Sequence, residues 1–149
     1  MRIAVISDSH DNIWNLREVL KIVAQKSCGM IIHLGDFISP FMLKELEKAG
    51  IPVHGVFGNN DGDHFTATKM SLTTLNNITL HGIKGELTID NRSIGFTHYP
   101  DIAEGFAFTG KYDVICFGHN HTHSINKING TLLLNPGEVM GKDGSPGRR

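Results

Sequence analysis

The stretch "RIAVISDSHDNIWNLREVLKIV" (residues 2–23) consists of an apolar run, a polar turn and a helical pattern, in that order. The run Arg2–Ser7 is rich in β-branched residues, as expected for a short strand buried on both faces. It ends at "DSHDN", where Asp11 or Asn12 can cap a helix. The apolar residues after the turn recur at helical spacing: Ile13, Leu16, Val19, Leu20 and Val23. The stretch therefore predicts a strand, a polar turn and a helix.

The same order recurs further along the chain. "GMIIHLG" (residues 29–35) is a second apolar run, which ends at Asp36 and precedes a shorter helix predicted at Phe41–Lys48. "IPVHGVF" (residues 51–57) is a third run, ending in "GNNDGD" (residues 58–63). Strands that alternate with helices in this way are typical of a mainly parallel sheet with right-handed crossovers.

After about Thr74 the apolar runs lie closer together, and a helix is predicted only at Asp101–Phe108. The runs predict strands in six segments: "NITLHG" (77–82), "KGELTID" (84–90), "RSIGFTH" (92–98), "YDVICFG" (112–118), "HSINKI" (123–128) and "TLLLN" (131–135). Asp90-Asn91 and Asn129-Gly130 are turn signals, and Asn-Gly is a strong one for a two-residue hairpin. Without a linker or an internal repeat, we predict one domain over residues 1–149. The predicted fold class is α/β, with two facing mixed β-sheets flanked by helices in a four-layer α/β/β/α sandwich.

Composition narrows the class of protein. The chain is 40% hydrophobic and 19% charged, and its net charge of −1 argues against an extended nucleic-acid-binding surface. No apolar run approaches the roughly 20 residues of a membrane span, and the N-terminus turns polar too early for a signal peptide. Cys28 and Cys116 form no paired motif, as in proteins of a reducing compartment. We therefore expect a cytoplasmic protein with no membrane partner.

Polar side chains gather where the apolar runs end. Carboxylate, amide and imidazole groups follow five of the runs: Asp8, His10, Asp36, Asn59, His98, His119 and His121. In "FGHNHTH" (residues 117–123) three histidines alternate, which puts them on one side of an extended chain. Because ligands of open α/β sheets bind beyond the carboxyl ends of the strands, these side chains are expected to meet at one edge.

A set of Asp, Asn and His side chains without thiolates suits borderline and hard divalent ions. Seven side chains are too many for one ion. With one carboxylate bridging, they suit two ions roughly 3.5–4 Å apart, the geometry of in-line displacement at phosphorus. A water between two such cations is easily deprotonated and can attack phosphorus. The pattern therefore predicts a phosphoesterase that uses two metal ions.

The order "DSH", "GD", "GNND", "TH" and "GHNH" between Asp8 and His121 resembles the calcineurin-like metallophosphoesterase superfamily. "NPGE" (residues 135–138) is similar to the Asn-Pro-Gly turn of its small prokaryotic phosphodiesterase branch. The resemblance implies hydrolysis of a small phosphodiester by in-line attack of a metal-bridging hydroxide. It implies two divalent ions per chain, manganese foremost, with nickel, iron, zinc or cobalt as alternatives. One ion would be held by Asp8, His10 and His121, the other by Asn59, His98 and His119, with Asp36 bridging.

Three features depart from the wider family pattern. Asn60 stands where phosphoprotein phosphatases of this superfamily have a histidine thought to protonate the leaving group. Asn60 and the bridging Asp36 are the catalytic candidates, although an amide cannot act as a general acid near neutral pH. Tyr99-Pro100 follows His98 where relatives often have glycine, which changes access to the site. Relatives usually add a strand after "NPGE", so we expect a short or missing C-terminal strand, an uncovered sheet edge and self-association.

The remaining polar residues admit less specific interpretations. His33 is expected in the core or behind a ligand carboxylate, and His54 and His81 are expected to be structural. His64 and His123 face either solvent or substrate, and Asp61 either orients the "GNND" loop or lies in an exposed turn. Sharp exits from strands are expected at four glycines: Gly35, Gly58, Gly82 and Gly118.

Two rival functions belong to other classes. A catalytically weak scaffold or protein-binding module would share the fold but is expected to lose ligands, whereas all seven positions are filled here. A nuclease-like enzyme would need a basic surface for a polymer, which the net charge of −1 does not supply.

Overall fold

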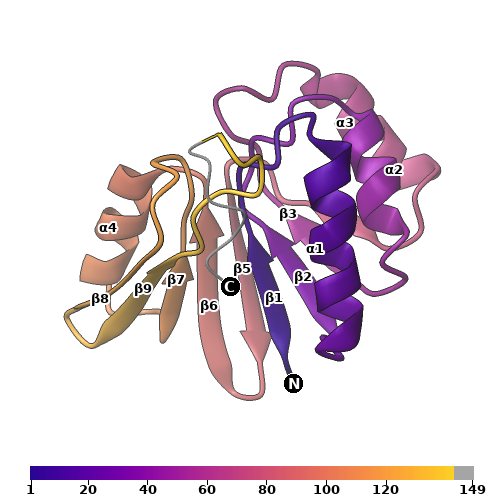
Figure 1. Cartoon of the computed structure of the whole chain (residues 1–149). Helices are drawn as coiled ribbons and strands as arrows, with labels where there is room; N and C mark the ends of the chain where they lie inside the picture. Colours follow the sequence, from indigo (N-terminus) through magenta and orange to yellow (C-terminus); the bar gives the residue numbers. More distant parts are fainter. Residues whose placement is uncertain (143–149) are drawn as a thin grey trace.

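Two β-sheets lie against each other between layers of helices in the computed structural model, which describes residues 1–142 (Figure 1). The first sheet has the order β1-β2-β3-β4, and every neighbouring pair in it is parallel. Its strands are β1 (Ile3–Ile6), β2 (Met30–His33), β3 (Val53–Gly55) and β4 (Ile78–Leu80). Its connecting helices are α1 (Ile13–Gln25), α2 (Phe41–Glu47) and α3 (His64–Thr73).

The second sheet is mixed and has the order β5-β6-β7-β9-β8. It consists of β5 (Lys84–Ile89), β6 (Arg92–Thr97), β7 (Val114–Cys116), β8 (Ser124–Ile128) and β9 (Thr131–Asn135). Its helix, α4 (Pro100–Phe108), begins with a proline at a position where the missing N–H costs nothing. In Figure 1, α4 covers the second sheet on the flank opposite to α1, α2 and α3.

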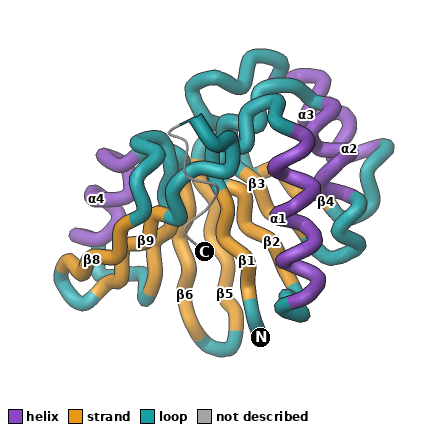
Figure 2. Tube along the Cα trace, viewed as in Figure 1, coloured by secondary structure: helices purple, strands orange, loops and turns teal. Residues whose placement is uncertain are grey.

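The register of the strand pairing brings the turns that follow the strands to one edge of the sheets. In the first sheet Ile6 lies opposite His33, and His33 lies opposite Gly55, so three parallel strands end level with one another. In the second sheet Phe96 and Cys116 are paired in the same way. Figure 2 shows the long loops gathered at this end of both sheets. Turns far apart in the sequence therefore share one edge.

The interface between the sheets is apolar. Residues from both sheets form its buried cluster: Ile32, Leu34, Val56, Ile94, Phe96 and Cys116. A side chain at Gly85 would place its Cβ only 2.1 Å from the Phe96 ring, so only glycine fits there. This packing fixes the two sheets relative to each other and, with them, the turns at their shared edge.

The predicted fold class is confirmed, with corrections to its details. The first sheet is wholly parallel, because the segment 77–82 joins it as β4 through the crossover helix α3. Helix α3 was not predicted from the sequence, since only Ala67 of it is buried while Phe65 and Leu72 are exposed. The predicted short C-terminal strand falls on residues outside the described range. Among the described helices, none is long and apolar enough to cross a membrane.

Candidate metal centre

Five of the seven predicted ligands stand on sharply turned backbone at the carboxyl edge of the strands. Asp8, His10, Asp36, His119 and His121 all have positive φ, between 45° and 75°. Non-glycine residues rarely adopt this left-handed conformation, and in folded proteins it collects at functional sites. Backbone hydrogen bonds between the turns hold it, such as His10 N–H to the Asp36 carbonyl at 2.8 Å.

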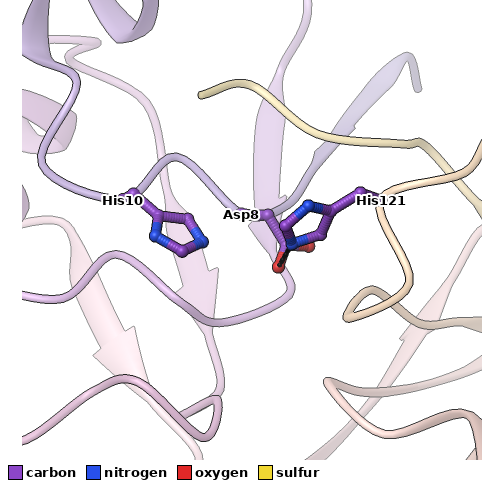
Figure 3. Close-up of side chains that lie close together, drawn as sticks. All are labelled: Asp8, His10 and His121. Atoms are coloured by element: carbon purple, nitrogen blue, oxygen red, sulfur yellow. Dashed lines mark ion pairs between the residues drawn. The ribbon is translucent and has the colours of Figure 1, made fainter. Parts of the chain in front are cut away.

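Asp8, His10 and His121 form a first group of candidate ligands (Figure 3). One donor atom from each lies within 4.8 Å of the others. The Asp8 carboxylate is fully buried, and its Oδ1 lies 3.2 Å from His121 Nε2. Its Oδ2 accepts hydrogen bonds from the Ser7 hydroxyl and, at 3.2 Å, from the His119 backbone N–H. Figure 3 shows both imidazole rings directed toward this carboxylate.

Unsatisfied polar atoms in the first group fit a cation. Asp8 Oδ1 and His10 Nε2 are buried, and neither makes a hydrogen bond to any part of the chain that the structure describes. Buried polar atoms without partners are costly, and nearly all find one in native proteins. A divalent ion bound by this oxygen and this nitrogen would satisfy both atoms.

Asn59, His98 and His119 form a second group. His98 is fully buried, and its Nδ1 donates to the Leu34 carbonyl at 2.7 Å, so its Nε2 carries a lone pair. That Nε2 lies 3.0 Å from Asn59 Oδ1 and 3.2 Å from His119 Nδ1. His119 Nδ1 lies 2.9 Å from the same Asn59 oxygen. These atoms are the donor types that suit a borderline divalent ion.

Asp36 lies between the two groups. Its side chain is buried, and its Oδ2 is 3.7 Å from His10 Nε2 and 3.6 Å from His98 Nε2. Donor atoms of Asp36, Asp8 and His98 also converge within 4.8 Å of one another. A single carboxylate thus reaches a ligand of each group, which is the arrangement that a bridging ligand requires.

Two residues of the "GNND" loop hold Asp36. Asn60 donates its backbone N–H to Asp36 Oδ1 at 2.9 Å and its side-chain N–H to Oδ2 at 2.7 Å. Asp61 accepts the backbone N–H groups of Asp36, Gly58 and Ile38. Burial raises the pKa of the Asp61 carboxyl, although these N–H groups act in the opposite direction. The Asn60 side chain therefore contacts the central carboxylate directly, and Asp61 orders the turn that carries Asp36.

The other histidines lie apart from the two groups. His33 is buried behind the site, where its Nε2 lies 2.9 Å from Ser9 Oγ, and burial lowers its pKa to about 3. His64 is exposed and stacks on Phe57 at 3.9 Å, and His123 is exposed. His54 and His81 form a pair of their own, described below.

Sequence reasoning missed contributors from the segment 135–138. Asn135 is buried and donates its amide N–H to the Gly118 carbonyl at 2.9 Å, beneath the loop that carries His119 and His121. Glu138 Oε2 lies 3.0 Å from His121 Nδ1. The "NPGE" motif was a visible signal, but the alignment of an acid with His121 depends on tertiary structure.

Comparisons with known proteins agree with this geometry. Residues 1–148 match the family model described as the calcineurin-like phosphoesterase superfamily domain. The phosphodiesterase MJ0936 of Methanocaldococcus jannaschii is 32% identical over 143 residues, which cover 95% of this chain and 86% of the relative. The probable metallophosphoesterase YsnB of Bacillus subtilis is also 32% identical, with 93% of this chain and 75% of the relative covered.

Solved structures show the same likeness. A novel archaeal phosphodiesterase superposes with a TM-score of 0.87 at 30% identity, over 95% of this chain and 87% of that chain. Vacuolar protein sorting 29 of Cryptosporidium parvum has a TM-score of 0.71 at 22% identity, over 93% and 75% of the two chains, and this likeness concerns the fold alone. From the family model and the relatives together, the chain belongs to the calcineurin-like phosphoesterase superfamily and is a hydrolase of that family.

Proposed function

We propose that the protein hydrolyses a small phosphodiester with two divalent cations, manganese foremost, and with nickel, iron, zinc or cobalt as alternatives. Asp8, His10 and His121 would hold one ion, and Asn59, His98 and His119 the other, with Asp36 bridging. The observation that carries the proposal is the place of Asp36, whose Oδ2 lies within 3.7 Å of an imidazole nitrogen of each group. The unsatisfied Asp8 Oδ1 and His10 Nε2 support it further.

When bound, the two ions would lower the pKa of a water and neutralise charge that grows on the phosphoryl oxygens. The side chains of the chain fix the geometry for this chemistry. Asn60 clamps both oxygens of Asp36, and Asp61 anchors the backbone on either side of it. The Leu34 carbonyl accepts the N–H of His98 Nδ1, so the lone pair on Nε2 would be available to a metal ion. Asn60 holds a ligand and cannot supply a proton, so substrates with activated leaving groups are favoured.

A diester rather than a monoester is supported by MJ0936, a relative at 32% identity that is named a phosphodiesterase. The net charge of −1 supports a small substrate over a nucleic-acid polymer. The free thiols of Cys28 and Cys116 support a cytoplasmic location. Self-association is supported by β8, an edge strand whose Ile125 is 57% exposed.

A protein-binding module without catalysis is the alternative function. It would have no need for ligands at all seven positions, nor for the hydrogen bonds that orient Asp36 and His98. The discriminating experiment measures metal content by elemental analysis and turnover of an aryl phosphodiester with and without Mn²⁺. We expect two ions per chain and turnover that depends on Mn²⁺. A chain with two bound ions and no turnover on any phosphoester would favour the module.

A further inference from the structure

Glu138 lies beside the first group of ligands. Its Oε2 is 3.0 Å from His121 Nδ1, and its side chain is only 10% exposed. The other nitrogen of the same ring, Nε2, lies 3.2 Å from Asp8 Oδ1. The His121 imidazole therefore has a carboxylate next to each of its nitrogens. Asp8 is a predicted ligand, whereas Glu138 is not.

The backbone on both sides of Glu138 is fixed. Before it, Gly137 has a positive φ of 81°, and its N–H donates to the Asn135 side chain at 2.8 Å. After it, the N–H groups of Val139 and Met140 donate to the carbonyls of Ser7 and Asp8, each at 3.0 Å. Glu138 is thus tied to the turn that carries Asp8, and its position next to His121 is built into the fold.

In the second group, the Nδ1 of the buried histidine has no carboxylate beside it among the residues that the structure describes. The Nδ1 of His98 donates to a neutral backbone carbonyl, that of Leu34, where His121 has a carboxylate. Asn59 and His119 are not carboxylates either, so the shared Asp36 is the only carboxylate that the proposed function assigns to the second ion. The first group has Asp8 in addition to Asp36, and Glu138 directly behind it. A divalent cation gains more from the first group on electrostatic grounds.

We propose that Glu138 is a positioning residue, which orients His121 and makes the first group the tighter of two unequal cation sites. The proposal rests on the proposed function, since it needs both groups to bind metal. A carboxylate beside Nδ1 favours the tautomer that has its proton on that nitrogen, which leaves the lone pair on Nε2, the nitrogen that lies near Asp8. Such partners behind a histidine ligand typically contribute roughly 10- to 100-fold in metal affinity.

The test is a titration of the metal-free protein with Mn²⁺, with the free ion followed by its electron paramagnetic resonance signal. The wild type should bind two ions of unequal affinity. Glu138→Gln keeps the shape of the side chain without its charge, and it should weaken the tighter ion about 10-fold while leaving the weaker one unchanged. Glu138→Ala should weaken the tighter ion further, by up to roughly 100-fold. Glu86→Gln, at a 56% exposed side chain on β5, is the matched control and should change neither affinity.

The outcomes separate the claims. If Glu138→Gln and Glu138→Ala bind both ions as the wild type does, the inference is wrong while the proposed function stands. If both variants lower the melting temperature of the metal-free protein yet keep the tighter affinity, Glu138 is structural only and the inference is again wrong. A wild type that takes up no Mn²⁺ would overturn the proposed function itself.

Discussion

The two halves of the candidate centre lie at one edge of the sheets but differ in charge and burial. The Asp8 half has a fully buried carboxylate and a histidine flanked by two carboxylates. In the Asn59 half, Asn59 and His119 are exposed, and none of the three candidate ligands is a carboxylate. Buried anions hold a cation more strongly than exposed neutral ligands do, because solvent screens them less. We therefore expect the Asp8 half to be the stronger of the two proposed metal sites.

The halves are nevertheless coupled. Asp36 lies against both of them, and the His119 backbone N–H donates to Asp8 Oδ2, so the loop of the second half is tied to a ligand of the first. Binding of an ion by the Asp8 half should therefore help to fix the His119 loop and so favour binding of an ion by the Asn59 half. Asp36→Asn, His121→Ala and His119→Ala test how far the two halves are distinct. Two further predictions concern Asn60 and a region outside the centre.

The largest effect is expected for Asp36→Asn, which changes the carboxylate proposed to bridge the two ions. We expect loss of both ions and a fall in turnover of roughly 10²- to 10³-fold or more. Metal content per chain and turnover of an aryl phosphodiester would be measured together. Asp90→Asn, at an exposed turn carboxylate that pairs with the N-terminus, is the control and should behave as the wild type. An Asp36→Asn protein with two tightly held ions and normal turnover would contradict the bridging role.

The next comparison sets His121→Ala against His119→Ala, one ligand from each half. His121→Ala should abolish the tighter ion, whereas His119→Ala should affect mainly the weaker one. Excess Mn²⁺ should therefore restore more turnover to His119→Ala than to His121→Ala. Turnover measured over a range of Mn²⁺ concentrations checks this order. Equal losses that respond equally to Mn²⁺ would show that the halves do not differ.

Asn60→His tests whether a general acid at position 60 can donate a proton to the leaving group. A general acid typically contributes 10²- to 10⁴-fold, and a partial gain of about 10-fold is expected for the poorest leaving groups. The gain is limited because the imidazole must also replace the Asn60 side-chain contact with Asp36 Oδ2. A series of aryl and alkyl phosphodiesters at saturating Mn²⁺ should give a flatter dependence of rate on leaving-group pKa. Parallel slopes for the two proteins would leave Asn60 with a role in holding Asp36 alone.

The smallest effect concerns a region outside the centre, the pair formed by His54 and His81. His54 Nδ1 lies 2.9 Å from His81 Nε2, and His81 packs edge-on against Phe96 of the second sheet. Burial lowers the pKa of both rings, and the neighbouring His81 lowers that of His54 further. The unfolded chain then binds more protons, so this stabilisation is complete above the unfolded pKa near 6.5 and is lost as pH falls through the folded pKa values.

Thermal melts of the metal-free protein at pH 7.5 and pH 5 measure this contribution. Replacing both rings, as in His54→Gln with His81→Gln, should reduce the drop in melting temperature between the two pH values by roughly 2–4 °C. His64→Gln is the control, since that ring is exposed. The same drop in the wild type and in the double variant would exclude the pair as the cause.

The residues at the carboxyl ends of the strands could be predicted from the sequence, but helix α3 and the partner of strand β4 could not. Asp8, Asp36 and Asn59 could be placed together because each follows a β-branched run, and parallel strands end at one edge. Helix α3 could not be predicted, because Ala67 is its only buried residue and no apolar stripe marks it. Strand β4 could not be assigned to the first sheet either. It has only three residues paired with β3, and so short a sequence does not indicate which strand it pairs with.

Within the centre, the candidate ligands could be chosen from the sequence, but the side chains that hold them in place could not. The "GHNH" motif singled out His119 and His121, whereas the alternation alone also included His123, which is exposed and lies outside both groups. The contact between Glu138 and His121 joins residues 17 positions apart through the backbone pairing of Val139 with Ser7. The hydrogen bonds of Asn60 to Asp36 likewise depend on a close approach of two turns, which Gly58 permits because it has no side chain. Such contacts follow from tertiary packing, and no local pattern reports them.

The most direct test of the central claim follows turnover of an aryl phosphodiester while Mn²⁺ is added to the metal-free wild type in known equivalents. If two unequal sites act together around Asp36, the first equivalent should bind tightly with little turnover. Activity should then rise as the second equivalent binds and level off at two ions per chain. Full activity after one equivalent, or no turnover with two ions bound, would contradict a two-metal phosphodiesterase.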